Sequence, residues 1–162
     1  MVRWAEFEGA EPGFAERVRA RFDAQTHKLV ATLRADGSPR LSGIEVTFRD
    51  GDVWLGMMPG SAKAADLRRD PRLALHTSSP DPDEADPTAW VGDAKMDGTA
   101  EEVTDEAEWA RYTGDSGAEP GAYHLFRVDV TRVGTVRVEG APPRLAIETW
   151  RPDTGLRRVE RD

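Results

Sequence analysis

Residues 27–57 read HKLVATLRADGSPRLSGIEVTFRDGDVWLGM, and this stretch decides the fold. It holds three runs rich in β-branched, aliphatic and aromatic residues, separated by the dipeptides Asp36-Gly37 and Asp50-Gly51. Asp-Gly is typical of the tight turns that join antiparallel strands, because both residue types tolerate the positive φ angles that such turns need. The stretch therefore predicts an antiparallel meander with strands at 29–33, 39–48 and 53–57.

Helices are predicted on both sides of this meander. Before it, Phe14, Val18 and Phe22 recur at helical spacing between residues 13 and 25, which predicts an amphipathic helix. After it, Ser61 is placed to cap a short helix at 62–69 that Asp70-Pro71 ends. Another helix is predicted at 105–112. Further strands are predicted at 72–76, at 90–103 with a kink near Gly98, and at 123–130, 135–138, 145–150 and 156–160.

About seven short strands with few helices indicate an antiparallel barrel or sandwich. A length of 162 residues suits one domain, so a single domain over 1–162 is expected. Residues 78–90 are acidic and rich in proline, which predicts a surface loop inside that domain. Trp54 and Trp150 alternate with apolar neighbours, so we expect them first of all in the core or at an interface.

The composition excludes several classes of function. A net charge of −8 argues against nucleic acid, which needs a basic face. No run approaches the roughly 18 apolar residues of a membrane span, and without cysteine there is neither a disulfide nor a thiolate nucleophile. The first residues are polar and unlike a signal peptide. The expectation is a cytoplasmic protein that binds neither nucleic acid nor membrane.

The segment Gly60-Ser61-Ala62-Lys63 carries the clearest chemical signal. It follows a predicted strand and opens a predicted helix, whose first amides are unpaired and attract anions. A lysine in that first turn is electrostatically unfavourable unless an anion binds there. Gly60 allows close approach of the backbone, and Ser61 can donate its hydroxyl to a phosphate oxygen. The alternative is that Ser61 only caps the helix and Lys63 points into water.

The order and spacing of residues 32–42 and 60–75 resemble the pyridoxamine 5′-phosphate oxidase-like superfamily, which includes flavin and deazaflavin oxidoreductases. The resemblance covers residues 27–103, with a looser echo at 145–161. It implies a mainly β fold, a six- to seven-stranded antiparallel split β-barrel of Greek-key type with a few short helices. It also implies a homodimer that binds FMN, or alternatively the deazaflavin coenzyme, at the dimer interface.

The resemblance implies a set of cofactor-binding residues. Ser61, Lys63 and Arg40 match the residues that hold the cofactor phosphate. Leu41, Ser42 and Gly43 match the stretch whose backbone borders the flavin ring, and Met57 and Met58 fall where the strand turns toward the phosphate. Lys95 lies on a strand that lines the groove, and Trp150 and Arg161 echo a C-terminal Trp and Arg that contact flavin. Of these, Trp150 and Arg161 fit only with a one-residue insertion.

Three departures argue against pyridoxamine phosphate oxidase activity itself. Ala62 replaces an arginine that helps to hold the phosphate, and Asp93 stands where a glutamine usually contacts the ring. The C-terminal pattern that grips pyridoxal phosphate appears as residues 157–159 without its histidine. No catalytic residue is identified, and the three histidines are too far apart in sequence to predict a metal site.

The leading hypothesis is an oxidoreductase that uses FMN or a deazaflavin to transfer hydride to a small organic substrate. A deazaflavin carries an acidic tail, which Arg68, Arg69 and Arg72 would bind if they face the groove; otherwise they are solvent-facing helix charges. The alternative from another class is a non-catalytic flavin- or haem-binding stress or carrier protein. A third possibility is an interaction domain without cofactor that works through the acidic loop.

Overall fold

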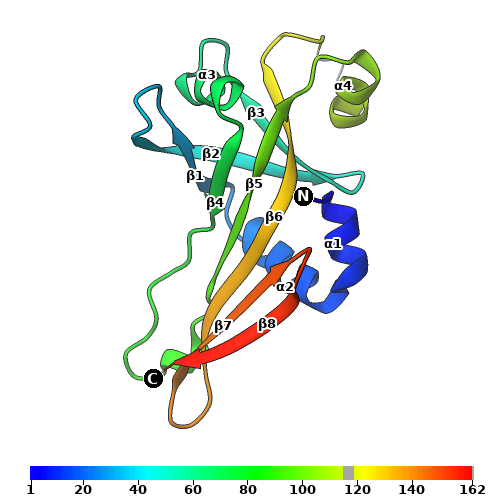
Figure 1. The fold of residues 1–162 in the computed structure, drawn as a ribbon. Coiled ribbons are helices and arrows are strands. Elements are labelled where there is room, and N and C mark those ends of the chain that lie inside the picture. The colour runs from blue at the N-terminus through cyan, green and yellow to red at the C-terminus, as the bar shows by residue number, and fades with distance from the viewer. Residues whose placement is uncertain (115–118, 162) are drawn as a thin grey trace.

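The structure is a computed structural model, and it describes residues 1–114 and 119–161. The strands of this part form one antiparallel sheet in the order β3-β2-β1-β4-β5-β6-β7-β8, and a further pairing of β3 with β6 closes the first six into a barrel (Figure 1). Their bounds are β1 (His27–Leu33), β2 (Pro39–Arg49), β3 (Asp52–Met57), β4 (Arg72–His76), β5 (Asp93–Glu102), β6 (His124–Glu139), β7 (Arg144–Arg151) and β8 (Gly155–Arg161). The predicted mainly β split barrel is confirmed, with eight strands in the described residues.

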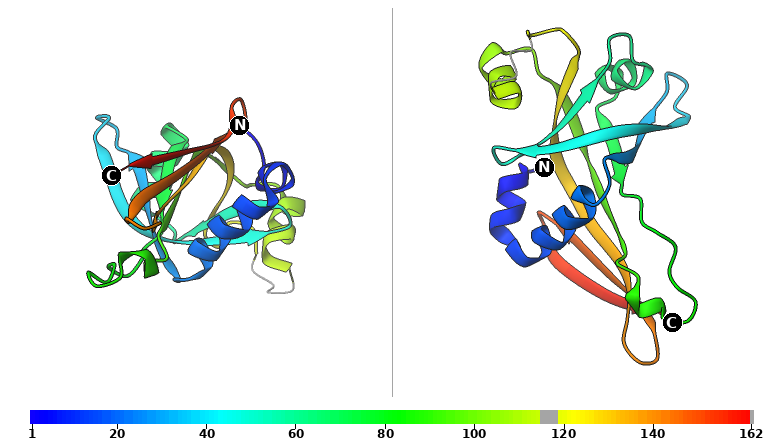
Figure 2. Two further views of the ribbon diagram at one scale, coloured as in Figure 1. Left: turned by 90° about the horizontal axis from the view of Figure 1, so that it is seen from below. Right: turned by 180° about the vertical axis from the view of Figure 1, so that it is seen from behind.

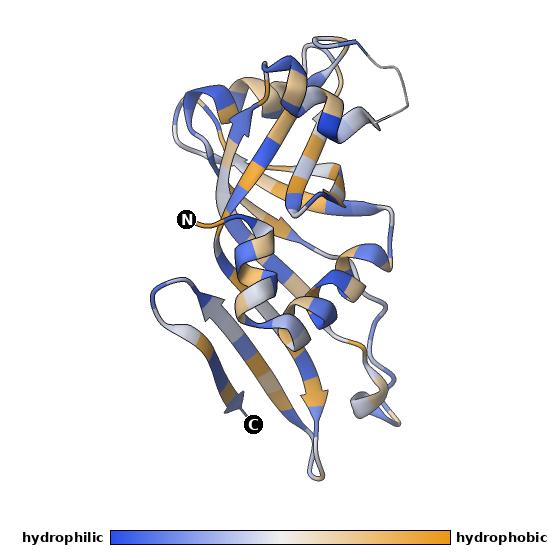
Figure 3. Ribbon diagram, turned by 90° about the vertical axis from the view of Figure 1, so that its right-hand side faces the viewer, coloured by the Kyte–Doolittle hydropathy of each residue, from blue (hydrophilic) through white to orange (hydrophobic). Residues whose placement is uncertain are grey.

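The two Asp-Gly turns join β1 to β2 and β2 to β3, as predicted. Asp50 and Gly51 have φ angles of 52° and 77°, and Gly37 has a φ of 81°. Positive φ is costly for residues with a side chain, and Asp is one of the few that tolerate it. Hydrophobic and hydrophilic residues alternate along the strands of the barrel (Figure 3). Because successive side chains of a strand point to opposite faces, the hydrophobic ones can share the inner face.

Strand β6 is the longest element, with 16 residues. One of its edges pairs with β3 over His124–Val128 and then with β7 over Val133–Glu139, while the other edge pairs with β5. The prediction of two separate strands at 123–130 and 135–138 is therefore wrong. Residues 131–134 (Thr-Arg-Val-Gly) separate the two predicted strands, but β5 pairs with residues 132–134 and β7 pairs with residues 133–134, which keeps the chain extended. A register shift between Asp97 and Gly98 of β5 lies where the kink was expected.

Helices α1 (Trp4–Ala10) and α2 (Pro12–Asp23) lie between the barrel and the β7–β8 hairpin (Figures 1 and 2). Their buried aromatic side chains enter the main core, where the rings of Phe7 and Trp150 are 4.7 Å apart. Trp54 and Trp150 are buried, as expected. The sequence pattern did not predict α1, because a seven-residue helix is too short to show a clear period.

Helices α3 (Ala62–Arg69) and α4 (Glu106–Thr113) lie at the opposite end of the molecule from β7 and β8 (Figure 1). Residues 78–90 are mostly exposed and contain one short 3-10 helix, η1 (Pro87–Ala89). The Trp90 indole donates to the carbonyl oxygen of Pro80 at 2.9 Å and holds this loop together. Among the helices of the described residues, none has the length and apolar character needed to cross a bilayer.

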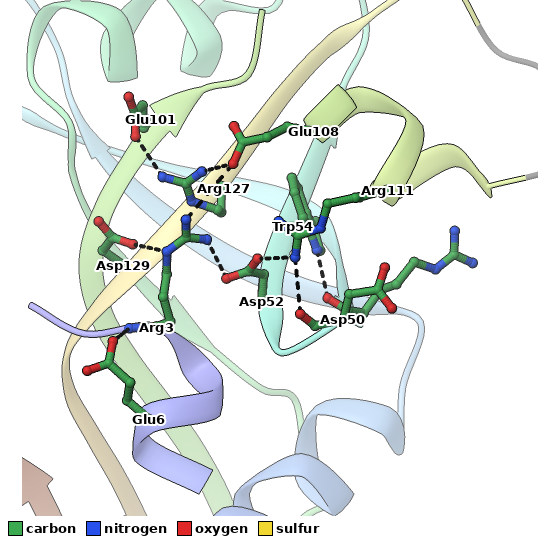
Figure 4. Close-up of polar contacts among 11 residues, drawn as sticks. Arg3, Glu6, Asp50, Asp52, Trp54, Glu101, Glu108, Arg111, Arg127 and Asp129 are labelled. Carbon is green, nitrogen blue, oxygen red and sulfur yellow. Dashed lines mark hydrogen bonds and ion pairs between the residues drawn. The ribbon is translucent and has the colours of Figure 1, made fainter. Parts of the chain in front are cut away.

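A cluster of ion pairs ties the N-terminus and α4 to the barrel (Figure 4). The carboxylate of Asp52 is buried and pairs with Arg3 at 2.5 Å and with Arg111 of α4 at 3.0 Å. Arg127 of β6 pairs with Glu108 of α4. A buried carboxylate is tolerated only when its charge is paired. These contacts therefore fix α4 against the strands that close the barrel.

The register shift in β5 generates a prediction at Gly98. A Cβ atom added there would lie 2.3 Å from the backbone oxygen of Asp129, which cannot move without disturbing the ladder. We expect Gly98→Ala to lower the free energy of unfolding by about 2 kcal/mol in a urea titration. Gly13→Ala in α2 is the control, because its Cβ meets nothing within 4 Å and alanine favours helix by about 0.5–1 kcal/mol. Equal stability of the two variants would contradict this packing.

Candidate functional site

The predicted phosphate segment forms a tight turn between β3 and α3. Residues 58–61 make this turn, in which the Ser61 amide donates to the Met58 carbonyl oxygen at 3.1 Å. Gly60 is its third residue and has a φ of 75°. Pro-Gly at the two central positions with positive φ at the glycine is typical of a type II turn. The sequence thus places Ser61 and Lys63 at the start of α3 through local turn chemistry.

Ser61 occupies the N-cap position of α3, but its hydroxyl makes no capping hydrogen bond. The prediction that this side chain caps the helix is therefore wrong, and the hydroxyl stays available to another partner. The Lys63 ammonium group donates to the carbonyl oxygen of Gly43 on β2 at 3.1 Å. Lys63 is half-buried, so it does not point freely into water. It connects the first turn of α3 to β2.

Strand β2 presents an open edge to this helix. Over residues 39–45 it pairs with β1 on one side, whereas its pairing with β3 begins only at Val46. The second edge of this segment thus has no strand partner in the described part of the chain. A Cβ atom added to Gly43 would meet nothing within 4 Å. Unpaired backbone groups beside open space are available to a planar ligand.

A buried carboxylate holds Arg40 of β2 against α3. Asp66 accepts hydrogen bonds from Arg40 at 2.6 Å, Thr32 at 2.9 Å and Arg69 at 3.1 Å. Burial by itself raises the pKa of Asp66, but these donors outweigh it and lower the pKa to about 2. Arg40 bonds through Nε alone, and its two terminal nitrogens have no partner among the described residues. They remain free to bind an anion.

These contacts border a groove of about 270 Å³. Of the predicted residues, Gly43, Met57, Met58 and Lys63 line it, while Arg40, Leu41, Ser42 and Ser61 adjoin these on the same strand or turn. The other lining residues are His27, Ile44, Glu45, Thr47, Gly56 and Tyr112. The structure therefore brings four of the predicted residues into one groove and places four others beside them along the chain.

Three predicted residues lie elsewhere in this chain. Lys95 of β5 lines a separate pocket beside Arg132 and Thr149. Trp150 of β7 is only 4% exposed and packs on Phe7, so the core already uses its ring. Arg161 is exposed at the end of β8, on the hairpin far from α3 (Figure 1). Within one chain these three do not join the groove.

The basic residues considered for an acidic cofactor tail each form an ion pair within the chain. Arg68 pairs with Glu102 at 2.5 Å, Arg69 with Asp66 at 3.1 Å and Arg72 with Asp70 at 2.6 Å. The hypothesis of a longer basic groove built from these arginines is therefore not supported.

Residues that the sequence reasoning missed are Asp66, Tyr112 and His124. Asp66 lies next to Leu67 on the buried face of α3. A carboxylate on an apolar helix face is seldom buried without a partner, so the sequence could have predicted a paired charge here. Tyr112 reaches the groove from α4, and His124 contacts the turn from β6. No local pattern in the sequence indicates either contact.

The Asp66 contacts predict how stability depends on pH. Asp66→Asn should lower the free energy of unfolding at about pH 7 by about 3 kcal/mol, because it removes the charge that pairs with Arg40. A carboxyl whose pKa is lower when folded stabilises the protein above its unfolded pKa of about 3.9, and this contribution is lost as the pH falls toward 2. The difference between wild type and variant should therefore shrink between about pH 5 and about pH 2.

Urea unfolding at several pH values measures this difference. Asp81→Asn is the control, because Asp81 lies in the exposed loop. A difference that stays constant on acidification would show that Asp66 is not a paired carboxylate in the folded protein.

Comparisons with known proteins support the fold described above. No protein of curated function matches the sequence. Among solved structures, a protein from Clostridium acetobutylicum related to general stress protein 26 of B. subtilis matches with a TM-score of 0.63 and 15% identity, over 87% of this chain and 96% of that chain. A pyridoxamine 5′-phosphate oxidase-related, FMN binding protein from Nostoc punctiforme matches with a TM-score of 0.61 and 12% identity, over 94% and 96%.

A heme binding protein from Mycobacterium smegmatis matches with a TM-score of 0.58 and 14% identity, over 90% of this chain and 86% of that chain. At these identities the structures support the fold alone. The family model of pyridoxamine 5′-phosphate oxidase matches residues 14–137, which include the meander, the Gly60 turn and α3. This chain therefore belongs to the pyridoxamine 5′-phosphate oxidase family.

Proposed function

We propose that the groove between β2 and α3 binds a phosphate-bearing flavin, FMN in the first place, and that the protein is an oxidoreductase acting on a small organic substrate. The observation that carries this proposal is the position of Lys63. Its ammonium group stands in the first turn of a helix and meets the open edge of β2. A cation at that end of a helix is unfavourable by about 0.3–1 kcal/mol, and a bound dianion reverses the sign of this effect.

Three side chains would hold the phosphate. Ser61 has a hydroxyl that the helix does not use, Lys63 supplies an ammonium group, and Arg40 supplies the terminal nitrogens that Asp66 leaves free. Asp66 fixes the orientation of Arg40 and keeps it close to α3. A phosphate bound by such a set gains charge-assisted hydrogen bonds in a fixed geometry.

The open edge of β2 would border the ring of the cofactor. The edge of β2 at residues 41–43 has no strand partner on this side among the described residues, although the Gly43 carbonyl oxygen already accepts from Lys63, and Gly43 leaves space for a flat ligand. Fixed N–H donors stabilise negative charge without reorganising. A bound flavin supplies hydride chemistry at its own ring, and the protein supplies placement and electrostatics. This division of roles agrees with the lack of a recognisable acid–base constellation in the sequence.

The arginines of α3 and β4 favour FMN over a deazaflavin coenzyme. Each of them pairs with a carboxylate, that of Glu102, Asp66 or Asp70, which makes these cations less available to an acidic tail. We do not propose oxidation of pyridoxamine phosphate, because the residues expected to grip that substrate are replaced at 157–159.

We also propose that a second copy of the chain completes the site. A groove of about 270 Å³ is below the roughly 300–1,000 Å³ of most ligand pockets. Directly opposed residues in a sheet share a face, and the ladder aligns Gly43 with Leu29, His76 and Lys95. Leu29 and Leu41 on this outer face are 40% and 66% exposed. A partner covering this face would bring Lys95 into the interface.

The phosphate assignment predicts that Ser61→Ala together with Lys63→Ala weakens FMN binding at least about tenfold without unfolding the protein, because two charge-assisted or polar contacts are lost. Absorbance of the purified protein titrated with FMN, and then with the deazaflavin coenzyme, measures the affinities. Arg151→Ala is the control, since this exposed arginine lies outside the groove. Unchanged affinity in the double variant would refute the assignment.

Turnover separates the enzyme from a carrier. The enzyme hypothesis predicts that the loaded protein oxidises or reduces its cofactor when an acceptor or donor is supplied. Protein that retains flavin but shows no turnover with any acceptor would support a carrier, and a haem absorbance band would support the haem-binding alternative.

The dimer predicts a mass in light scattering of about twice the 17.9 kDa of one chain. Leu41→Asp should give monomers, because a charge in an apolar interface is strongly unfavourable, and FMN affinity should fall with it. A wild-type monomer at micromolar concentration would overturn the interface proposal.

A further inference from the structure

A histidine connects the Gly60 turn to the barrel. The Gly60 amide donates to Nε2 of His124 at 3.3 Å, although the two residues are 64 positions apart. His124 is the first residue of β6, where it pairs with Met57 of β3. Its side chain is 20% exposed. The contact therefore joins the turn that carries Ser61 to the strand that closes the barrel.

The hydrogen bond requires a particular proton position on the ring. Nε2 can accept from Gly60 only if it carries no proton, so the neutral ring carries its proton on Nδ1. Nδ1 lies 3.1 Å from a carboxylate oxygen of Glu102, and its N–H donates there. The Arg68 guanidinium lowers the pKa of Glu102, which keeps this acceptor ionised. A charged acceptor at Nδ1 favours the tautomer that leaves Nε2 free.

Arg68 completes the network. It binds both oxygens of Glu102, at 2.6 and 2.5 Å, and one of its nitrogens lies 2.9 Å from Nδ1 of His124. Arg68 and Nδ1–H cannot donate to each other, so Glu102 accepts from both. Among the described residues, Glu102 of β5 and Arg68 of α3 are the charged groups that contact the ring.

Little else holds the turn. Apart from the bond from the Ala65 amide to the Ser61 carbonyl oxygen, which belongs to α3, its described hydrogen bonds run from the Ser61 amide to Met58 and from the Gly60 amide to His124. Met58 is 80% exposed and contributes little packing. Glycine has more backbone freedom than any other residue, so a contact at Gly60 from outside the turn stabilises its conformation further.

We propose that His124 is a positioning residue for the phosphate site: its unprotonated Nε2 holds the Gly60 amide and thereby fixes the turn that presents Ser61 and Lys63. This inference rests on the proposed function of that turn.

Two isosteric variants test the proposal. Glutamine can place its amide oxygen where Nε2 lies, whereas asparagine reaches only the position of Nδ1. We expect His124→Gln to bind FMN within about twofold of wild type at about pH 8, and His124→Asn to bind about tenfold more weakly. Thermal unfolding of both variants checks that each is folded. Wild-type affinity in His124→Asn, or equal loss in both variants, would overturn the proposal.

A second readout does not depend on any cofactor. The amide of Gly60 in the free protein should exchange with solvent at a similar rate in wild type and His124→Gln, and faster in His124→Asn, because only the first two place an acceptor opposite this amide. If wild type fails to bind FMN while the Gly60 amide still shows this pattern, the proposed function fails and the contact stands. A Gly60 amide that exchanges at the same rate in all three proteins would refute the contact itself.

Discussion

The structure depends on one strand, β6, that pairs with three other strands. β6 pairs with β5 along one edge, while its other edge pairs first with β3 and then with β7. The first pairing closes the barrel, and the second carries the β7–β8 hairpin beyond it. Because β3 and β7 use successive parts of the same edge, a gap opens between barrel and hairpin. The aromatic side chains of α1 and α2 fill this gap, and Trp150 packs there on Phe7.

The pairing of β3 with β6 also creates the candidate site, at the end of the barrel away from the β7–β8 hairpin. β3 leaves β2 after Val46, so that residues 39–45 keep an open edge, and the chain then turns at Gly60 into α3. Two contacts join α3 to this edge, from Lys63 to Gly43 and from Asp66 to Arg40. Asp66 is buried, and its paired charge explains why Arg40 keeps a fixed orientation. The fold thus places cations and free backbone groups beside one another.

Membership in the pyridoxamine 5′-phosphate oxidase family and the open groove support the same proposal, a flavin bound between copies of the chain. The groove of a single chain is small, and its outer neighbours Leu29 and Leu41 are exposed apolar residues. A partner that covers them would also exclude water from the ring. Water exclusion strengthens the electrostatic contacts on which placement of a charged cofactor depends.

The sequence by itself determined whatever follows from neighbouring residues. The Asp-Gly turns, the bounds of α3 and the position of Ser61 and Lys63 at its start all rest on turn chemistry and periodicity within a few residues. Family resemblance added the barrel. Only the tertiary structure decided that residues 131–134 continue β6, that Trp150 belongs to the core, that Asp66 contacts Arg40, and that His124 contacts the Gly60 turn. These features depend on strand pairings and contacts between distant residues, whose free energy no local pattern contains.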